Sequence, residues 1–479
     1  MTQSDIEKGL RDLGLGQGDV VLLHSSLRSL GHVDGGAQAV IDAFLAVLGE
    51  QGTLVVPTFG ALGIITEVVR EDPRAVRSIH PIAGVAAIGA QAEVICKDHW
   101  KAETAHGEGT PYTRIAELGG YVCLLGVDHD RNTTLHTVEA LLRLPYLSDR
   151  TLTFPAEDGE QVTHTWRFFP GPHRDFIGLD RLLREKGVMT VRRIGNSVVR
   201  LMKSRELIDV CLEAGRADPA FVLCDNPNCA DCVGQRAAIR RDRFAKEVFQ
   251  LTASSGLAGR YVPEMLANLS AGGIECVELD IVEGQPVQTL TEGQIQDVVE
   301  ELRGGGCTVT ALRCSAIPEA PEDVLDAAAN NGVPRVIMPL GSTSESLANA
   351  AASRSLGISF FNTVQGSMLA TEMLLALREK GYEVGFTFNA ANFARAGEKP
   401  FLYSFKKKLH GFVDQLDIED ACFDGSPQTL AHGNAEIKEM VSILRCASFG
   451  GCMTLTLGNR HVGTLRDAVE RFEALLDAM

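Results

Sequence analysis

Residues 20–58, VVLLHSSLRSLGHVDGGAQAVIDAFLAVLGEQGTLVVPT, indicate the fold class of the first half of the chain. The apolar run 20–23 has the length of a buried strand, and a Gly-Gly pair at 35–36 precedes a helical pattern over 37–48. A second apolar strand pattern follows over 53–56. Because strand, helix and strand in this order are typical of α/β folds, the sequence predicts a largely parallel sheet.

Polar side chains gather just after the predicted strands of this region. They are His24, Ser25 and Ser26 after the first strand, Thr58 after the second, and Asp128, Asp130, Thr133 and His136 after a further apolar run over 121–127. Open α/β sheets place their ligands at the carboxyl ends of the strands. We therefore expect the functional site of the first half at this edge of the sheet.

The alternation of strands and helices restarts near residue 249 and gives eight strand candidates. They cover 249–253, 276–281, 308–312, 335–339, 358–362, 383–388, 413–418 and 453–457, with helical stretches between them. Eight strand–helix units predict a closed (β/α)8 barrel of the TIM type. A strongly charged segment, RAAIRRDRFAKE at 236–247, separates the two patterns, so we expect two domains, 1–246 and 247–479.

Composition limits the classes of protein to which the chain can belong. The 479 residues carry a net charge of −17, with 45% hydrophobic and 22% charged residues, as folded enzymes and binding proteins do. The acidic balance disfavours nucleic acid as a partner. The sequence shows neither a signal-peptide pattern nor an apolar run of membrane-spanning length, so we expect a cytoplasmic protein without a membrane partner. Most of the 12 cysteines stand singly in apolar stretches, as reduced core residues do.

The clearest chemical signal is a histidine and a glutamate three residues apart, His136 and Glu139. The helical pattern over 134–144 places both on one helix face, near the end that points at the preceding loop. A carboxylate in this position orients an imidazole and raises its basicity, as a general base acting on an amine requires. The alternative is a capped helix with an incidental His/Glu pair, and spacing alone does not distinguish the two.

Four colinear segments resemble the aminoglycoside 3-N-acetyltransferase family over roughly residues 5–240. They are LHSSLRSLGHVDGGAQAVIDAFLAVLGEQGTLVVPTF (23–59), RSIHPIAGVAAIG (77–89), HGEGTPYTRIAELGGYVCLLGVDHDRNTTLHTVEALLRLPY (106–146) and RDFIGLD (174–180). The resemblance implies an N-terminal α/β sandwich domain of the antibiotic N-acetyltransferase type. It implies acetyl transfer from acetyl-CoA to a primary amine, namely the 3-amino group of an aminoglycoside antibiotic or a related amino sugar.

The resemblance also implies roles for three side chains. His136 would be the base, Glu139 its orienting partner, and Asp175 a second acidic group near the amine. Structural roles stay open for two of them, because Glu139 could be a helix salt-bridge partner and Asp175 could be an N-cap.

An acetyl-CoA site built from several short stretches is implied by the same resemblance. The residues are Ser25, Ser26, Leu27, Val56, Pro57, Thr58, His80, Gly84, Val85, Ala86 and Thr134. Small residues at 84–86 would let the backbone approach the pantetheine arm, and the hydroxyls of Ser26 and Thr58 would bind its amides. Ordinary turn chemistry is the alternative for Ser25. The implied reaction uses acetyl-CoA as co-substrate and needs no metal ion.

A cysteine-rich turn, Cys224-x4-Cys229-x2-Cys232, interrupts the pattern before the second half. Three thiolates so close together could ligate a tetrahedral zinc ion, but a fourth ligand is not evident from the sequence. We therefore predict a reduced turn packed on the sheet and assign no metal to the mechanism. Metal binding by these cysteines stays open.

The second half resembles, more faintly, the xylose isomerase-like (β/α)8 barrels. The segments that carry this resemblance are GYEVGFTFNAANFARAGEKPF (381–401), VDQLDIEDACFDG (413–425) and LAHGNAEIKEMVSILRCASFGGCMTLTL (430–457). Those enzymes hold divalent metals with Glu, Asp and His at carboxyl strand ends, whereas the matching points here are Asn362, Asn389, Asp417 and Thr456. We therefore predict a binding or scaffolding barrel that lacks the metal site. Polar groups that could hold a small sugar, or that are solvated loop residues, are Asn389, Asn392, Asp417, Glu419, Asp420 and His432.

These features predict an acetyl-CoA-dependent amine N-acetyltransferase linked to antibiotic resistance, followed by a degenerate barrel. Three alternatives are N-acetylation of a non-antibiotic aminated metabolite, a non-catalytic sugar-binding or regulatory protein, and a metal-dependent sugar isomerase. Retention of His136 and Glu139 argues against the second, and the loss of carboxylate ligands in the barrel argues against the third. One sequence does not determine the oligomeric state or the natural acceptor.

Overall fold

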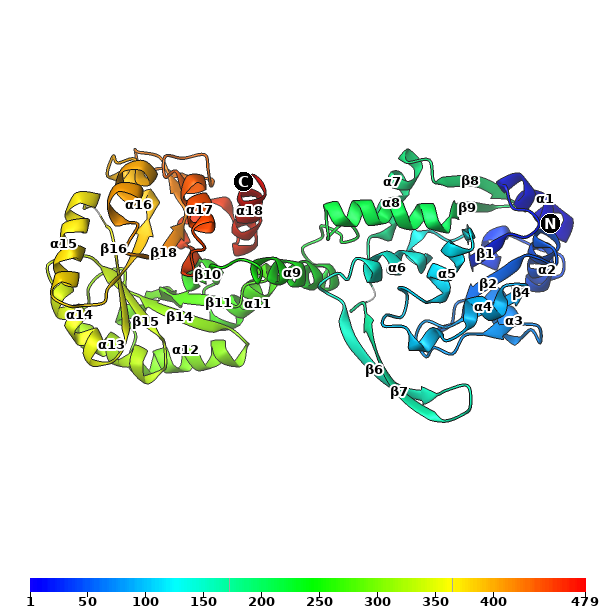
Figure 1. Cartoon of the computed structure of the whole chain (residues 1–479), viewed down its shortest axis with the longest axis horizontal. Helices are drawn as coiled ribbons and strands as arrows, with labels where there is room; N and C mark the ends of the chain where they lie inside the picture. The colour runs from blue at the N-terminus through cyan, green and yellow to red at the C-terminus, as the bar shows by residue number, and fades with distance from the viewer. Residues whose placement is uncertain (172, 364) are drawn as a thin grey trace. The chain divides into compact units, whose positions relative to one another are not determined.

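The computed structural model describes residues 1–171, 173–363 and 365–479, which divide into unit 1 (Met1–Ile239) and unit 2 (Arg240–Met479). The division falls inside α9 (Ala230–Phe244), in the charged segment where the sequence predicts a domain edge. Figure 1 shows a sheet covered by helices at the blue end of the chain and a barrel at the red end.

Unit 1 is built on a seven-stranded sheet in the order β3-β4-β2-β1-β5-β9-β8. The strands are β1 (Val20–Ser25), β2 (Thr53–Pro57), β3 (Val76–Arg77), β4 (Val85–Gly89), β5 (Tyr121–Leu125), β8 (Met189–Ile194) and β9 (Ser197–Lys203). β1 runs parallel to β2 and β5, whereas the other four pairings are antiparallel. The prediction of a largely parallel sheet is therefore wrong outside the three central strands. The outer pairs β3-β4 and β8-β9 are joined by short connections, which antiparallel pairing allows.

Helices cover both faces of this sheet. They are α1 (Gln3–Leu13), α2 (Gly36–Leu48), α3 (Ile64–Glu71), α4 (Ala92–Cys96), α5 (Pro111–Glu117), α6 (Thr134–Leu141), α7 (Leu179–Glu185) and α8 (Ser204–Ala217). Val21 and Leu23 of β1 pack in the core formed with α1, α2 and α3. Val20 and Leu22 of the same strand pack on the opposite face with α4 and α5. Because β1 is buried on both faces, it is apolar at every one of these positions, as strands inside layered α/β sheets are.

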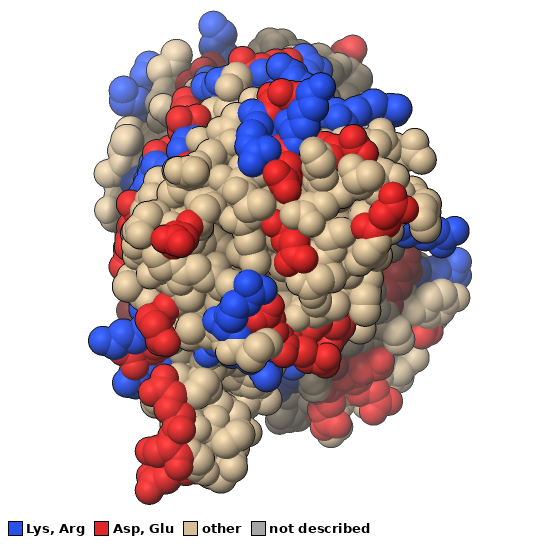
Figure 2. All heavy atoms as spheres, turned by 90° about the vertical axis from the view of Figure 1, so that its right-hand side faces the viewer, with Lys and Arg blue, Asp and Glu red and all other residues tan. Residues whose placement is uncertain are grey.

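A long hairpin, β6 (Ser148–Pro155) and β7 (Gln161–Phe168), forms a separate two-stranded sheet in unit 1. In β7, Trp166 is fully buried and donates its indole N–H to the carbonyl of Trp100 at 3.0 Å. The connection between the two strands carries Glu157, Asp158 and Glu160. Figure 2 shows an acidic projection on a face where basic and acidic side chains are otherwise interspersed. The hairpin therefore extends negative charge into solvent.

Unit 2 is a closed barrel of eight parallel strands. In barrel order they are β10 (Gln250–Ser254), β11 (Cys276–Leu279), β14 (Thr308–Arg313), β15 (Arg335–Pro339), β16 (Gly357–Phe361), β17 (Gly385–Asn389), β18 (Val413–Ile418) and β21 (Cys452–Leu455). Each lies at one of the eight predicted positions, so the predicted barrel is confirmed. Closure of the barrel buries the apolar side chains of the strands and of the surrounding helices in one core.

The helices of unit 2 follow the barrel strands and pack around them. They are α10 (Ser255–Ala258), α11 (Val262–Gly272), α12 (Glu292–Gly304), α13 (Pro321–Asn330), α14 (Ser344–Ser353), α15 (Ser367–Glu379), α16 (Ala390–Arg395), the π-helix η6 (Pro400–Leu409), α17 (Ile437–Cys446) and α18 (Leu465–Asp477). Two short hairpins, β12 (Ile281–Val282) with β13 (Gln285–Pro286) and β19 (Asp420–Ala421) with β20 (Pro427–Gln428), lie outside the barrel sheet. In the part of the chain that the structure describes, no helix has both the length and the apolar character that a membrane crossing needs.

Candidate functional site

A cavity of about 670 Å³ lies at the carboxyl ends of β1, β2 and β5 in unit 1. Its wall is formed by the loop after β1, the segment between β2 and α3, the segment between β5 and α6, and the aromatic side chains of Phe168, Phe169 and Phe176. Because β1, β2 and β5 are parallel neighbours, the loops after these strands meet at one edge of the sheet. The cavity volume is typical of a small-molecule site.

His136 lies on the wall of this cavity, in the first turn of α6. Its ring stacks on Phe169 with centroids 3.6 Å apart and an interplanar angle of 5°. Phe176 contacts the same ring edge-on, with 4.9 Å between centroids. The side chain keeps 16% of its surface exposed. The two phenyl rings therefore hold the imidazole in one plane while part of it stays accessible.

Glu139, one helical turn after His136, is buried and binds three side chains. Its Oε2 pairs with His136 Nδ1, and its Oε1 accepts from Arg174 Nε at 2.5 Å and from Tyr146 Oη at 2.8 Å. Burial by itself raises the pKa of Glu139, but His136 and Arg174 outweigh it and hold the pKa below its ordinary value. The carboxylate is therefore ionised where it meets the imidazole.

This arrangement leaves one ring nitrogen of His136 available for chemistry. Nδ1 faces the Glu139 carboxylate, so the neutral imidazole carries its proton there. Nε2 then carries the lone pair, and no described residue forms a hydrogen bond with it. An imidazole held in one tautomer by an ionised carboxylate is suited to accept a proton from a bound substrate and to stabilise the resulting charge.

Two other histidines line the cavity but are less suited to this role. Burial lowers the pKa of His24 to about 3. Burial, reinforced by the neighbouring His136, lowers the pKa of His106 well below its ordinary value. Both imidazoles therefore stay neutral near pH 7 and hold a transferred proton poorly. No described carboxylate pairs with either ring, which sets them apart from His136.

Four residues predicted for the acetyl-CoA site line the cavity, namely Ser25, Ser26, Leu27 and Pro57. Ser25 ends β1, and Ser26 precedes the short helix η1 (Leu27–Leu30). The Ser26 N–H donates to the carbonyl of Leu125 at 2.9 Å, and the Ser26 carbonyl accepts from Ser29 Oγ at 2.6 Å. These hydrogen bonds fix the loop after β1 at the edge of the cavity.

Four other residues predicted for the same site lie in the interior. Val56, Val85, Ala86 and Thr134 are fully buried, and the cavity wall, as described, does not include them. Val56 and Ala86 are cross-strand partners in the β2-β4 ladder. Val56, Val85 and Ala86 are enclosed by the β2-β4 pairing, and Thr134 packs at the start of α6. Their contact with acetyl-CoA stays a prediction.

His80, Thr58 and Gly84 build a turn that supports the wall from inside. Burial lowers the pKa of His80 to about 2, and the neutral Nδ1 accepts the N–H of Ala83 at 3.1 Å. Thr58 donates its N–H to the carbonyl of Gly84 at 2.7 Å. A Cβ on Gly84 would lie 3.1 Å from the His80 carbonyl oxygen and 3.3 Å from Thr58 Oγ1, so the turn leaves little room for a side chain.

Asp175 lies apart from the described cavity wall, and its alternative role as an N-cap is the one observed. Its exposed carboxylate caps η4 (Phe176–Gly178) and accepts the N–H of Gly178 at 3.2 Å. The neighbouring Arg174, which the sequence analysis did not single out, contacts Glu139 instead. Arg174 and Tyr146 both stand in the segments that carry the family resemblance, but no local pattern shows that they reach α6.

In unit 2, polar residues predicted at the strand ends belong to one buried network. Arg313, which the sequence analysis did not identify, donates to Asp417 at 2.6 and 2.9 Å and to Glu278 at 3.0 Å. Asn389 donates to Asp417 at 3.0 Å and to Glu419 at 2.9 Å. Asn389, Asp417, Glu278 and Glu419 are buried, and Arg313 keeps 13% of its side-chain surface exposed. The alternative of solvated loop residues is therefore wrong for Asn389, Asp417 and Glu419. A single guanidinium is thus shared by two carboxylates inside the barrel, Asp417 and Glu278.

The other predicted polar groups of the barrel organise its loops. Asp420 accepts the N–H groups of Ala421, Gly433 and Ala435. Asn392 donates to the carbonyl of Asn362 at 2.7 Å, and Thr456 donates to Glu419 at 2.5 Å. His432 Nδ1 lies 3.0 Å from the carbonyl of Leu430. These contacts give each group a structural partner.

The cysteines of the turn at 224–232 lie together in unit 1, and His173 lies with them. A fourth ligand is not evident from the sequence, because His173 precedes Cys229 by 56 residues. The structure corrects this point: three thiols and one imidazole form a donor set of the kind that holds zinc.

Comparison with known proteins places unit 1 among characterised enzymes. A family model described as aminoglycoside 3-N-acetyltransferase matches residues 22–62 and 60–214. Aminoglycoside N(3)-acetyltransferase IV of Salmonella sp is 34% identical over 230 residues, which is 45% of this chain and 87% of that enzyme. Aminoglycoside N(3)-acetyltransferase VII of Streptomyces paromomycinus is 30% identical over 264 residues, which is 44% of this chain and 89% of that enzyme.

Solved structures of similar proteins cover the same share of the chain. Aminoglycoside acetyltransferase AAC(3)-IVa, as the apoenzyme, is 32% identical, with a TM-score of 0.46 over 50% of this chain and 97% of that chain. A structure described as AAC-IIIb binary with CoASH is 21% identical, with a TM-score of 0.43 over 45% of this chain and 97% of that chain.

The sequence match to the two relatives extends over more than four fifths of each of those enzymes. The family match includes the segments that carry His136, Glu139 and Arg174. This chain therefore belongs to the aminoglycoside 3-N-acetyltransferase family, and it is an enzyme of the aminoglycoside N(3)-acetyltransferase type.

Proposed function

We propose that unit 1 transfers the acetyl group of acetyl-CoA to a primary amine of an aminoglycoside or a related amino sugar. The observation that carries the proposal is the series of contacts from Arg174 through Glu139 to His136 on the cavity wall. The relatives of the chain are named for N(3)-acetylation of aminoglycosides, which supports the choice of acceptor class.

In the proposed reaction, Nε2 of His136 accepts a proton from the acceptor nitrogen as that nitrogen attacks the thioester carbonyl carbon. The C–N bond forms, and the carbonyl electron pair moves to oxygen in a tetrahedral intermediate. Collapse of this intermediate breaks the C–S bond and releases the CoA thiolate, which accepts from His136 the proton that came from the acceptor nitrogen. Glu139 keeps its contact with Nδ1 throughout and stabilises the imidazolium between the two transfers.

The proposed acetyl-CoA site follows the loop after β1 and the end of β2. Ser25, Ser26 and Leu27 line the cavity beside Pro57, so the thioester and pantetheine arm would lie along them. Arg28 continues the same wall, and a guanidinium is well suited to bind the phosphates of the coenzyme. The chemistry proposed for the reacting atoms uses no metal ion.

The charge of the wall favours a second candidate acceptor, an amino sugar or metabolite with fewer amines than an aminoglycoside. Among the wall residues that the structure describes, Asp130 is the single carboxylate, and it pairs with Arg131 at 3.3 Å. A polycationic acceptor gains most from several carboxylates near its ammonium groups. An acceptor with one or two amines would need fewer of them.

The test is acetyl-CoA-dependent thiol release by the full chain against a panel of aminoglycosides and simpler amino sugars. We expect release with at least one amine, abolished by His136→Ala and retained by His32→Ala, because His32 is an exposed histidine outside the cavity wall as described. Folding of both variants is checked by circular dichroism. Absence of thiol release with every amine would favour the sugar-binding alternative and overturn the proposal.

A further inference from the structure

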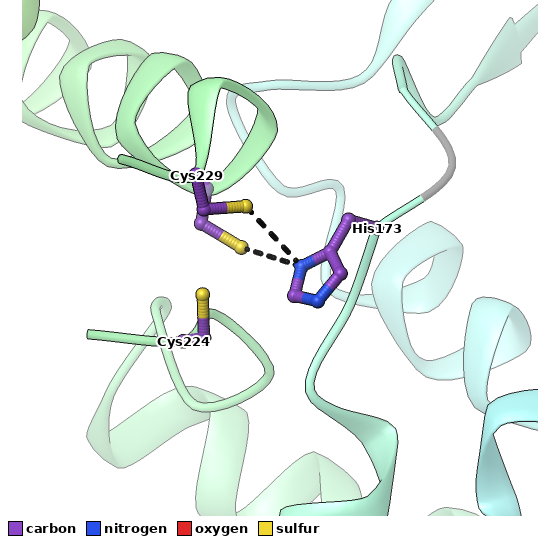
Figure 3. A group of neighbouring side chains, drawn as sticks. His173, Cys224 and Cys229 are labelled. Atoms are coloured by element: carbon purple, nitrogen blue, oxygen red, sulfur yellow. Dashed lines mark hydrogen bonds between the residues drawn. The ribbon is translucent and has the colours of Figure 1, made fainter. Parts of the chain in front are cut away.

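Four metal-binding side chains meet in unit 1 where the segment after β7 approaches the start of α9. They are His173, Cys224, Cys229 and Cys232, whose ligand atoms all lie within 4.8 Å of one another. Figure 3 shows the imidazole of His173 pointing at the sulfur of Cys229, with the sulfur of Cys224 on the other side of the same space. We propose that these four residues bind one zinc ion, which holds the segment around His173 against the beginning of α9.

The distances fit a tetrahedral ion. His173 Nδ1 lies 3.3 Å from Cys232 Sγ and 3.4 Å from Cys229 Sγ. With zinc bonds of about 2.0–2.3 Å, the ligand atoms of a tetrahedral site are separated by about 3.6–3.8 Å. Small side-chain movements therefore suffice to place the four donor atoms around an ion. All three cysteines have free thiols, so no disulfide competes for these sulfurs.

Zinc binds cysteines as thiolates and releases their protons, so occupation by the ion changes the charge of the site. Three thiolates and one dication leave a net negative charge. Nearby, the guanidinium of Arg236 donates to the carbonyls of Leu223 at 2.8 Å and Cys224 at 3.4 Å and pairs with Asp225 at 2.7 Å.

Outer contacts orient the proposed ligands. The N–H of His173 donates to Asp231 Oδ2 at 3.0 Å, and Asp231 stands next to Cys232 in α9. Gly171 has a φ of +68°, and a Cβ at this position would lie 2.3 Å from Asp231 Oδ1, so the chain needs glycine there. In the turn between the first two cysteines, Cys229 donates its N–H to the carbonyl of Asn226 at 3.1 Å. Such contacts to the groups around a ligand are typical of preorganised metal sites.

A second cluster of metal-binding groups in unit 1 does not carry the same inference. Asp128, His129 and Asp180 also lie close together. Their carboxylates are already paired with a cation, because Arg200 binds Asp128 at 2.7 Å and Asp180 at 3.1 Å. Comparable guanidinium contacts to the sulfurs at 224–232 are absent from the described structure, which leaves the thiols available.

The position of the proposed zinc site connects it with the cavity. His173 is followed by Arg174, whose Nη1 donates to the His173 carbonyl at 2.6 Å and whose Nε donates to Glu139 at 2.5 Å. Glu139 in turn holds His136. The ion would therefore fix the backbone from which Arg174 reaches the buried carboxylate. This link to acetyl transfer rests on the function proposed above, whereas zinc binding itself does not.

The first test is the zinc content of the full chain, purified under reducing conditions without chelator and measured by plasma mass spectrometry. We expect about one zinc per chain, lost in Cys229→Ser and in His173→Ala and retained in Cys446→Ser, an exposed cysteine of unit 2. His173→Cys should keep the ion, because four thiolates also form a zinc site. Zinc near background in folded wild-type protein, or a content unchanged by Cys229→Ser, would overturn the proposal.

Cobalt(II) gives a second readout that does not depend on variants that fold poorly. Protein stripped with a chelator and titrated with cobalt should show the strong visible absorption of a tetrahedral site and thiolate-to-metal charge transfer in the near ultraviolet. Saturation at about one cobalt per chain supports the site. A weak octahedral spectrum would contradict it.

The link to the cavity is tested on the same samples. Zinc removal should lower acetyl transfer about tenfold or more, and added zinc should restore it. Unchanged activity in stripped protein would overturn the link while leaving the zinc site intact. If the wild-type chain acetylates no amine, the proposed function fails, and the zinc content and cobalt spectrum still test the site.

Discussion

Each unit of this protein contains a buried carboxylate that is bound by an arginine, yet the two arrangements differ in what lies on the other side of the carboxylate. In unit 1, Arg174 holds Glu139, and Glu139 holds His136 on the wall of a cavity. In unit 2, Arg313 is shared by Asp417 and Glu278 inside the closed barrel. The first network ends on a group that can react, whereas the second is satisfied within itself.

The pKa shifts express the same difference. Burial opposes ionisation at Glu139, but its two cationic neighbours hold its pKa below the ordinary value. For Glu278, burial raises the pKa and is the largest effect, while Arg313 opposes it and the nearby Asp417 adds to it. In unit 2, one arginine is shared by two carboxylates and the pKa of Glu278 is raised, whereas in unit 1 Glu139 stays ionised next to an imidazole. An ion network indicates a reaction site only when one of its members remains accessible.

The largest expected effect separates the two networks by activity. Replacing His136 with alanine should lower kcat/KM for acetyl transfer by about 10²–10⁴-fold, because the proposed base is lost while the core packing of α6 remains. His461→Ala, a change to an exposed histidine of unit 2, should leave the rate within about twofold. Steady-state thiol release measures both. Equal activity of wild type and His136→Ala would show that the network in unit 1 is structural, as the one in unit 2 is.

The barrel network should respond in stability and not in rate. Arg313→Met leaves Asp417 and Glu278 buried without their cation, and we expect a loss of about 3–5 kcal/mol in the free energy of unfolding of unit 2. Adding Asp417→Asn and Glu278→Gln to Arg313→Met should recover much of the lost free energy of unfolding, since neither carboxylate charge then remains. Denaturant unfolding, monitored by hydrogen exchange in peptides of the barrel, measures the change in the free energy of unfolding. A loss in acetyl transfer by folded Arg313→Met would contradict the division between the two networks.

Arg174 sharpens the comparison because it acts through another residue. Arg174→Met should lower kcat about 10–100-fold with a smaller effect on KM, since Glu139 loses a partner that holds it against His136. Arg174→Lys should be intermediate, because a lysine replaces the charge but not the planar guanidinium. A pH–rate profile of each variant is the test, because a loss of packing alone would not shift the profile. Identical profiles for wild type and Arg174→Met would remove Arg174 from the proposed site.

The smallest effect concerns stability and pH. Burial lowers the pKa of His24 to about 3 and that of His99 to about 4 in the folded protein, against 6.5 in the unfolded chain. Below pH 6.5 the unfolded chain therefore binds more protons at these histidines than the folded protein does. Acidification below that pH thus lowers the free energy of unfolding of unit 1, whereas above it this loss is absent. We expect unit 1 to lose about 1–2 kcal/mol per buried histidine between pH 7 and 5.

Unit 2 provides the internal control for this titration. Its Glu278 has a raised pKa, so its contribution to stability is present at low pH and is lost as the pH rises through the folded value. Hydrogen exchange at pH 7 and 5, resolved into peptides of each unit, separates the two trends. Parallel destabilisation of both units on acidification would contradict the assignment of the acid sensitivity to the buried histidines of unit 1.

Much of the architecture was predictable because it depends on short-range patterns. The apolar run that becomes β1 and the eight runs that become the barrel strands are visible as local stretches of hydrophobic residues. The direction of β4, β8 and β9 was not predictable from such runs, because parallel and antiparallel strands have the same local period. His136 and Glu139 were also found locally, since three residues on a helix place two side chains on one face.

Partners from distant segments required the folded chain. Arg174 reaches Glu139 across 35 residues, His173 reaches Cys229 across 56, and Arg313 reaches Asp417 across 104. Helix and strand periodicity relates only residues that are a few positions apart, so no linear pattern specifies these pairs. Local sequence thus determines most strands and helices and places His136 and Glu139 on one helix face. The tertiary structure decides which distant arginine pairs with each buried carboxylate, and whether that carboxylate also contacts an accessible side chain.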